Sequence, residues 1–509
     1  MTRENDGAAS PEPLSHTAMP DRAVIDRRAL WILAAVALLT RAWQFGNPVI
    51  QVDEQFYLLA GDRLLHGILP FVDIWDRKPL GLFGLYAAIR LLGGTGIIQY
   101  QLVATLFAAA TAMVIALMAT RIAGRSGAII AGIVYLVFIM ANGGDGGQAP
   151  VFYNLPVACA ALLVMRVAER PAFDRLSALQ ALAAMALLGL AIQIKYTVVF
   201  EGVFFGLCLA WDLWRKRVGP VSVLLSMLMW CVVALIPTAM AILLYWHLGF
   251  LQPFLFANFE SIFLRSATAD LDVPGRLLKI VVHVAPAAVG ALWGLVILIR
   301  AGTSPARWFV AGWFATTIIA LLGFGTYHDH YALPLLVPFA LAGAPLYDDA
   351  GRGIGFSRFR LSIRSVILLI AIVGSAIIVN DTRRDRGDGV AVYDAARLVG
   401  ATPDDCIFVF NGDPILYLLT KSCLPTRYVF TTFLSERRDA DSLGVDQMDE
   451  LRATMAKRPR YVFTRLPIPA EAQPAAWAYM KTILARDYRP VFREHAGRSD
   501  ILGYQRTTQ

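Results

Sequence analysis

Long apolar segments recur along the first 380 residues, and no other feature restricts the fold of this chain as much. A run of about 18 or more residues with few charges is long enough to cross the hydrocarbon core of a membrane as a helix. We therefore predict an α-helical membrane protein with eleven transmembrane helices. The apolar segments lie at about 29–47, 98–120, 126–142, 151–166, 177–194, 196–213, 219–246, 276–299, 308–325, 331–347 and 361–380.

Composition agrees with a membrane protein and excludes several other classes. Hydrophobic residues make up 57% of the 509-residue chain, and only 17% of the residues are charged. Typical soluble domains carry roughly 25% charged residues, so a soluble enzyme and a disordered chain are both excluded. The formal net charge is +8. The Lys and Arg residues lie largely between apolar segments, which explains this excess without a nucleic-acid partner.

The segment 79–92 decides the topology. It is apolar but only 14 residues long. A helix of that length reaches about 21 Å, which is short of the hydrocarbon core of about 30 Å. We therefore predict that it lies along the membrane interface. Every short basic loop then falls on one side of the membrane, which the positive-inside rule identifies as the cytoplasm. The basic residues of these loops are Arg121, Arg125, Arg166, Arg170, Arg175, Arg215, Lys216, Arg217, Arg300, Arg307, Arg352, Arg358, Arg360 and Arg364.

The same assignment fixes both ends of the chain. Residues 1–28 are polar and end in a basic cluster, so we expect a disordered cytoplasmic N-terminus. The run 29–47 is too long for the core of a signal peptide and lacks a small-residue cleavage site, which favours an uncleaved first span. On the outer side the assignment places the loops 48–97, 143–150, 247–275 and 326–330.

Residues 381–509 follow the eleventh span and are soluble in composition, so we expect them on the outer side too. Strand-like runs at 407–410 and 461–464 alternate with helix-like runs at 393–399 and 446–456, which predicts a small α/β domain. We find no carboxylate–cation cluster in this region and predict an accessory role. Its Asn411–Pro414 segment is typical of a turn after a strand.

Cysteines leave two possibilities open. Cys406 and Cys423 lie in the C-terminal region, where an oxidising compartment would permit a disulfide, but two unpaired thiols are equally compatible with the sequence. No Cys/His spacing indicates a zinc site. Carboxylate pairs could bind a divalent metal ion, although no set of ligands demands one. We therefore predict no certain cofactor.

Charged side chains gather in the first outer loop, residues 48–97. A loop that only linked two helices would need no such cluster. At the membrane surface these groups can meet a lipid head group and a water-soluble partner together. The candidate residues in this loop are Asp53, Glu54, Tyr57, Asp73, Asp76, Arg77 and Lys78.

This set of side chains suits the transfer of a sugar from a lipid phosphate. The leaving phosphate is already a stable anion, so it needs a cation such as Lys78, with Arg77 beside it, and no general acid. The acceptor hydroxyl or amine must lose a proton as it attacks, and Asp53 or Glu54 is the candidate base. The alternative is that Asp53 caps a helix that begins near Gln55.

Further candidates lie outside this loop. Asp145 follows two glycines that would allow a ligand to approach closely, although a flexible turn would have the same sequence. Lys195 and Arg41 lie at the outer ends of their spans, where each could bind the donor phosphate or only extend to the head groups. Aromatic residues near the start of the tenth span could contact the sugar or form an interfacial belt. The residues assigned to substrate binding are Tyr57, Asp73, Asp76, Asp145, His328, His330 and Tyr331.

The order of these features resembles the GT-C glycosyltransferases. The closest resemblance is to families 39 and 83, which include protein O-mannosyltransferases and the aminoarabinose and galacturonic acid transferases of lipid A. It rests on Asp53-Glu54 after the first span, an Asp-containing turn and Lys78-Pro79 opening the interfacial helix. It covers about residues 29–200 and is weaker at 325–334.

By position, the resemblance implies that Asp53 is the catalytic carboxylate, with Glu54 beside it, and that Lys78 is a phosphate ligand. One departure concerns the start of the interfacial helix, where His-Pro-Pro is common in the family. This chain has Arg77-Lys78-Pro79 there, which makes the role of Lys78 a weaker inference than that of Asp53.

The resemblance also implies a domain organisation and an activity. A GT-C catalytic module would span 29–380, and a periplasmic α/β domain would span 381–509. The expected reaction is an inverting transfer of one sugar from a polyprenyl phosphate to an envelope glycan, a glycolipid such as lipopolysaccharide, or a protein. It would take place at the periplasmic face of the bacterial inner membrane.

Two other functions compete with this one. A transporter or flippase of a lipid-linked saccharide would be expected to show inverted repeats and broken spans, and the sequence shows neither. A ligase or polymerase that moves a whole oligosaccharide would differ only in the size of its substrate.

Overall fold

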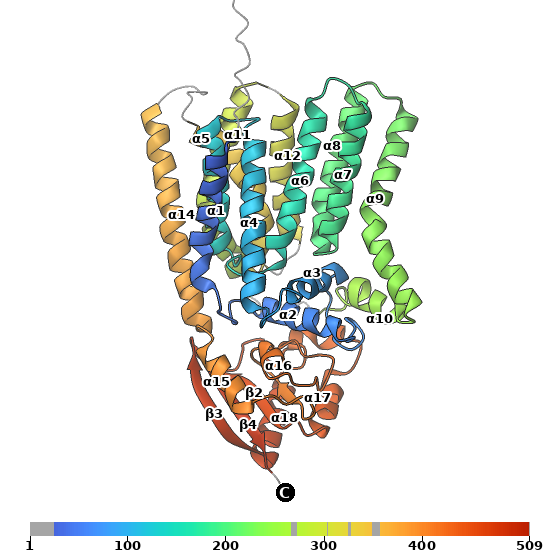
Figure 1. Cartoon of the computed structure of the whole chain (residues 1–509), viewed down its shortest axis with the longest axis vertical. Coiled ribbons are helices and arrows are strands. Elements are labelled where there is room, and N and C mark those ends of the chain that lie inside the picture. The colour runs from blue at the N-terminus through green and yellow to red at the C-terminus, as the bar shows by residue number, and fades with distance from the viewer. Residues whose placement is uncertain (1–24, 266–271, 303, 324–326, 349–356, 508–509) are drawn as a thin grey trace, which may run out of the picture.

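The computed structural model describes residues 25–265, 272–302, 304–323, 327–348 and 357–507. The expected disordered segment 1–28 lies almost entirely outside this range, as does Arg352. Two parts are visible in Figure 1, a bundle of long helices and a smaller C-terminal domain that covers one end of it.

Eight helices in the described residues are long and apolar enough to cross a membrane, so the chain is a multi-pass membrane protein. Each of them matches one of the predicted spans. They are α4 (Ile97–Ala119), α6 (Ala149–Glu169), α7 (Arg175–Ile192), α8 (Val199–Arg215, preceded by the turn η2, Tyr196–Val198), α9 (Pro220–His247), α11 (Val273–Arg300), α12 (Pro305–Gly323) and a composite helix made of η4 (Asp329–Leu335), α13 (Leu336–Gly343) and η5 (Ala344–Tyr347).

The other three predicted spans are also helical, and they run beside these eight (Figure 1). α1 (Arg27–Arg41) has 15 residues and α5 (Arg125–Ala141) has 17, so both are shorter than a span of ordinary length. α14 (Ser357–Arg386) is 30 residues long and carries charged residues at both ends. A 3-10 turn, η1 (Ala42–Gln44), follows α1.

Several of the predicted basic loops lie together at one end of the bundle. Arg125 pairs with Asp26 at 2.5 Å, and Arg121 pairs with Glu169. Lys216 donates to the carbonyl of Val167 at 2.9 Å. The bundle has its other end at the C-terminal domain (Figure 1), so these loops and that domain lie at opposite ends of the bundle.

Two short helices lie crosswise between the bundle and the C-terminal domain (Figure 1). α2 (Val52–Leu65) and α3 (Leu80–Arg90) come from the first outer loop. Gly61 lets them cross closely, because a Cβ at this position would lie 2.6 Å from the backbone nitrogen of Ala87. The prediction that 79–92 does not cross the membrane is confirmed by the position and length of α3. A second link follows α9 and consists of α10 (Leu251–Leu255) and a π-helical turn, η3 (Phe256–Glu260).

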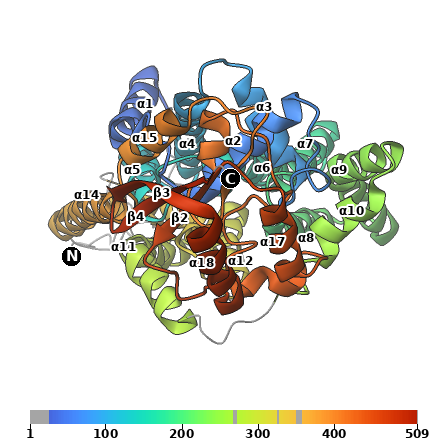
Figure 2. The ribbon, with the colours of Figure 1, turned by 90° about the horizontal axis from the view of Figure 1, so that it is seen from below.

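The C-terminal domain is the predicted small α/β domain. Its sheet has the order β1-β2-β4-β3, in which β1 pairs with β2 in parallel and the other pairs are antiparallel. The view from below shows the domain lying across the end of the bundle (Figure 2). Its elements are α15 (Val390–Val399), β1 (Ile407–Val409), α16 (Ile415–Leu419), η6 (Arg437–Ser442), α17 (Gln447–Ala456), β2 (Tyr461–Leu466), α18 (Pro474–Asp487), β3 (Tyr488–Ala496) and β4 (Ser499–Arg506).

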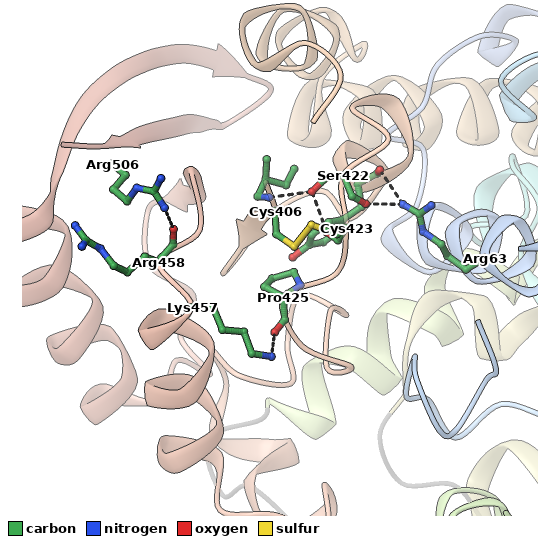
Figure 3. The surroundings of a disulfide bond; sticks show 10 residues. Arg63, Cys406, Ser422, Cys423, Pro425, Lys457, Arg458 and Arg506 are labelled. Atoms are coloured by element: carbon green, nitrogen blue, oxygen red, sulfur yellow. Dashed lines mark hydrogen bonds between the residues drawn. A yellow bond between two sulfur atoms is a disulfide. The ribbon is translucent and has the colours of Figure 1, made fainter. Parts of the chain in front are cut away.

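Cys406 and Cys423 form a disulfide, so the structure selects one of the two possibilities that the sequence left open. The bridge lies between the start of β1 and the loop after α16 (Figure 3). The adjacent Ser422 carbonyl accepts a hydrogen bond from Arg63 of α2 at 2.6 Å. The bridged loop therefore contacts the helix that carries Asp53.

Candidate active site

A cavity of about 960 Å³ lies where the bundle, the crosswise helices and the C-terminal domain meet. One part of its wall is apolar and comes from the transmembrane helices and the π-helical segment. The rest is polar and comes from the first outer loop, η4 and the C-terminal domain. The apolar part includes Ile192, Ile194, Val199, Leu235, Ile262, Phe263 and Leu321.

Asp53 lies in this wall, in the first turn of α2. The helix begins at Val52, and its N-cap is Gln51. Asp53 is thus inside the helix, and the alternative that it caps the helix is wrong. Its carboxylate accepts hydrogen bonds from Tyr57 Oη at 3.3 Å and from Gln148 Nε2 at 3.3 Å.

Lys78 lies between two carboxylates. Its Nζ is 3.2 Å from Asp53 Oδ1 and 3.1 Å from Asp76 Oδ2, and it lies 5.3 Å from the ring centroid of Tyr57. Burial is the largest single influence and would raise the pKa of Asp53, but the charge and hydrogen bond of Lys78, together with His330 and Gln148, hold this pKa well below its ordinary value. Asp53 is therefore ionised at neutral pH, as a general base must be.

Lys195 lies in the same wall, in the connection between α7 and η2. Its Nζ lies 4.6 Å from the ring centroid of Tyr331. Among the described residues no carboxylate lies within ion-pair distance of this ammonium group. Burial lowers the pKa of Lys195 to about 8. An unpaired cation beside an apolar wall can bind the phosphate of a lipid.

The residues predicted from the start of the tenth span also line the cavity. His328 and His330 stack with their ring centroids 5.8 Å apart, and His330 packs edge-on against Tyr331. His328 Nε2 lies 3.2 Å from Arg438 of the C-terminal domain. Burial, with Arg438 as the next cause, lowers the pKa of His328 to about 4. This imidazole is therefore neutral and can exchange hydrogen bonds with a sugar.

Glu54, Arg41 and Asp145 form a second buried cluster behind Asp53, and none of the three lines the cavity. Arg41 donates to the carbonyls of Gly144 and Gly146. Glu54 fits against Gly146, where a Cβ would come within 2.0 Å of Glu54 Oε2.

These three residues therefore do not line the cavity, and their predicted phosphate, base and substrate roles stay predictions. Burial, and secondly the charge of Asp145, raise the pKa of Glu54 to about 8. Glu54 thus lacks both the access and the charge of a base at neutral pH. Asp145 accepts a hydrogen bond from Gln44 at 2.9 Å. The cluster fixes the loop that presents Gln148 to Asp53.

Two other predicted residues have different partners from those expected. Asp73 closes its own turn by accepting from the backbone nitrogen of Leu69 at 2.8 Å, and it does not line the cavity. Arg77 does line the cavity, but it pairs with Asp439 of the C-terminal domain at 3.0 Å and lies 4.8 Å from the ring centroid of Trp75. Asp73 is thus excluded from direct substrate contact, and Arg77 is already neutralised.

The C-terminal domain supplies much of the polar wall, so the prediction that it carries no carboxylate–cation cluster is wrong. Asp439 is fully buried between Arg77 and Arg265, the latter at 3.1 Å. Burial would raise the pKa of Asp439, but these two cations lower it to about 2. The cluster joins the first outer loop, the loop after α10 and the domain.

The predicted turn Asn411–Pro414 lines the cavity as well. Asp413 pairs with Arg465 at 2.6 Å and accepts a hydrogen bond from Gln55 of α2 at 3.1 Å. Glu436 lies nearby, and burial together with Glu471 raises the pKa of Glu436 to about 7. The domain therefore contributes to the wall from several segments.

Glu201 is a residue of the cavity wall that was not predicted from the sequence. It lies in the first turn of α8, is buried, and lines the cavity close to Tyr153. Its signal was visible, because it is the lone carboxylate in the apolar run 196–210. An ionisable residue inside a span is by default a candidate functional residue.

Among the described residues no group of three or more His, Cys, Asp or Glu side chains is placed to hold a metal ion. Two carboxylates of the cavity wall, Asp53 and Asp76, are engaged with Lys78. The cavity therefore combines an ionised carboxylate, an unpaired cation and an apolar wall.

Comparison with known proteins identifies the fold. No protein-family model matches this chain, and no curated protein matches it by sequence. ArnT from Cupriavidus metallidurans bound to undecaprenyl phosphate superposes with a TM-score of 0.59 at 14% identity, over 93% of this chain and 97% of that one. Archaeal oligosaccharyltransferase AglB from Archaeoglobus fulgidus, in complex with an inhibitory peptide and a dolichol-phosphate, superposes with a TM-score of 0.56 at 13% identity. The match covers 94% of this chain and 74% of that one. The chain has the GT-C fold that these proteins share.

Proposed function

We propose that this protein is a glycosyltransferase that moves a sugar from a polyprenyl phosphate to an acceptor at the periplasmic face of the bacterial inner membrane. One observation carries the proposal. An ionised carboxylate, Asp53, and an unpaired cation, Lys195, face the same cavity, and that cavity has an apolar wall for a lipid. The solved structures with this fold include one bound to undecaprenyl phosphate and one bound to a dolichol-phosphate.

The reaction follows from the positions of these groups. The lipid chain lies against the apolar wall, and its phosphate binds Lys195, with Lys78 as the next cation. The acceptor hydroxyl or amine gives its proton to Asp53 as it attacks the anomeric carbon. The bond between that carbon and the phosphate oxygen breaks, and the phosphate leaves as an anion. A single displacement of this kind inverts the anomeric configuration.

The two sides of the membrane are assigned by charge and by sulfur chemistry. The positive-inside rule places the basic end of the bundle in the cytoplasm and the cavity on the other side. The disulfide between Cys406 and Cys423 is the form expected in an oxidising compartment such as the periplasm. The acceptor we propose is an envelope glycan, a glycolipid or a protein.

The test begins with the substrates. Envelope glycolipids and glycans from a deletion strain are compared with wild type by mass spectrometry, and we expect the loss of one sugar residue. Purified protein is then assayed with the matching polyprenyl-phosphate sugar, with and without a metal chelator. Asp53→Asn should lower turnover by about 10²–10⁴-fold, the range of a lost general base, with donor binding retained.

Glu54→Gln serves as the matched control, because it changes the neighbouring carboxylate, which does not reach the cavity. It should keep much more activity than Asp53→Asn. Near-normal turnover of Asp53→Asn, or a glycan profile unchanged in the deletion strain, would refute the assignment.

A further inference from the structure

A second pocket lies at the basic end of the bundle, away from the active-site cavity. It has a volume of about 560 Å³ and lies where α4 ends and where α6 is followed by α7. The apolar spans stop here, so this end lies at a boundary between membrane and water. Its lining residues are Arg121, Arg166, Glu169, Arg170, Pro171 and Gln180.

Positive charge exceeds negative charge around this pocket. Arg121 pairs with Glu169, and Arg170 pairs with Asp174. Arg166 is exposed, and among the described residues no carboxylate lies within ion-pair distance of it. The pocket therefore offers at least one arginine to an anion.

Further cations surround the pocket. Arg215 and Lys216 donate to the carbonyls of Ala168 and Val167, at 3.1 and 2.9 Å, and they share the carboxylate of Asp212. These two cations lie next to the end of α6 that carries Arg166. Their charge adds to the attraction for an anion in the pocket.

Two buried polar atoms at this pocket lack a hydrogen-bond partner. One is Arg121 Nε, a donor, and the other is Gln180 Oε1, an acceptor. Buried polar atoms without partners are costly, and an occupant that satisfied them would gain free energy. A phosphate oxygen satisfies the donor, and a hydroxyl group satisfies the acceptor.

An exposed apolar side chain lies next to the pocket on the membrane side. Leu117 lies on α4 one turn before Arg121, toward the middle of the bundle, with 39% of its surface exposed. An occupant with acyl chains would cover this residue. This favours a phospholipid over a free phosphate.

We propose that this pocket binds the head group of an anionic phospholipid that carries a glycerol hydroxyl, such as phosphatidylglycerol. Its phosphate contacts Arg121 and Arg166, its hydroxyl donates to Gln180, and an acyl chain lies against Leu117. Basic pockets at the ends of transmembrane helices bind anionic lipids through the same combination of charge and apolar contact. The site does not depend on the proposed glycosyl transfer.

The test measures lipid binding alone. Purified full-length protein in detergent is titrated with phosphatidylglycerol, phosphatidic acid, phosphatidylcholine or inorganic phosphate, and native mass spectrometry counts the bound lipid. We expect phosphatidylglycerol to bind more tightly than phosphatidylcholine. Arg166→Gln should weaken phosphatidylglycerol about fivefold, the loss expected for one arginine at a membrane surface.

Two variants make the result specific. Arg300→Gln removes an exposed arginine from the last turn of α11, outside the pocket, and should leave binding unchanged. Gln180→Leu should remove the preference for phosphatidylglycerol over phosphatidic acid. Equal effects of Arg166→Gln and Arg300→Gln would show that the lipid responds only to the overall positive charge of this end of the protein. Displacement of the lipid by an equal concentration of inorganic phosphate would show that the pocket is a site for soluble anions. Either result would overturn the proposal.

Discussion

Replacing Lys78 by methionine tests whether this cation keeps Asp53, the proposed base, ionised. Methionine is also a long, unbranched side chain, but it removes the charge that lies 3.2 Å from Asp53 and 3.1 Å from Asp76. In the variant two carboxylates share a partly buried site without a cation. Burial then acts on Asp53 without the opposing charge of Lys78, and only the weaker effects of His330 and Gln148 remain against it, so its pKa rises from its low wild-type value.

The size of the effect follows from the distance. Two unit charges 3.2 Å apart attract by about 5 kcal/mol at an effective dielectric constant of about 20. If about four fifths of this energy is lost, the proton affinity of Asp53 rises about a thousandfold, at about 1.4 kcal/mol for each factor of ten. The base of the variant is then protonated over a pH range in which the wild-type base is ionised.

The assay is the pH dependence of kcat/KM between pH 4 and pH 8. Protonation of Asp53 should not lower the activity of the wild type at the acid end of this range, because the pKa of Asp53 lies well below it. Lys78→Met should lose activity progressively as the pH falls. Lys78→Arg is the control, since it keeps a cation and should keep the wild-type profile shape. A Lys78→Met profile that is lower at every pH but has the wild-type shape would refute this reasoning.

Two further predictions concern other residues of the cavity wall, and a third concerns the orientation in the membrane. Lys195→Met should raise the donor KM. The wild type should lose donor binding above pH 8, because Lys195 has a pKa of about 8 and gives up its proton there, and the variant should not show this loss. Donor titrations at pH 7 and pH 9 measure both effects. Asp439→Asn should destabilise the protein by about 3–5 kcal/mol, the cost of leaving Arg77 and Arg265 without their buried carboxylate; thermal unfolding in detergent measures this, and an unchanged Tm would contradict it. Reporter fusions after residue 395 should be active only with a periplasmic reporter, and a cytoplasmic signal would reverse the orientation.

The sequence predicted the fold well where the physical signal was local. Apolar length and the basic loops located the spans, and the shortness of 79–92 distinguished α3 from a span. In the C-terminal domain, runs such as 407–410 and 461–464 became β1 and β2 because alternation and composition are properties of neighbouring residues. The strand order β1-β2-β4-β3 brings together residues far apart in the chain, and no local pattern encodes it.

In the candidate site too, residues close together in the sequence were predicted and contacts between distant residues were not. Asp53, Lys78 and Asp76 lie close in sequence and were recognised as one cluster. Arg41 was predicted as a phosphate ligand because a cation at the end of a span can bind a phosphate, although it can also only extend to the lipid head groups. Its actual partners are carbonyls about a hundred residues away, at Gly144 and Gly146. Only the packing of α1 against the glycine loop shows which use applies.

The contribution of the C-terminal domain was missed for the same reason. Arg77 and Asp439 are separated by 362 residues. Each is unremarkable in its own segment, and together they form a buried ion pair in the wall of the cavity. Glu201 is different, because its signal was local and was overlooked: one carboxylate in an otherwise apolar run.

The pairing of the cations around the cavity decides which of them can receive the donor phosphate. Arg77 and Arg265 share Asp439, and Arg465 pairs with Asp413. A phosphate that displaced one of these partners would leave a carboxylate unpaired at the cavity wall, which is costly. Lys195 has no carboxylate partner to displace among the described residues.

Lys78 is an intermediate case. It is shared by Asp53 and Asp76, so a phosphate that approached it would weaken its hold on the base. The phosphate would then raise the pKa of Asp53, first by drawing Lys78 away and then by its own negative charge. A carboxylate of higher pKa is a stronger base. Donor binding to Lys195 and Lys78 would therefore prepare Asp53 to take the acceptor's proton only when the donor is in place.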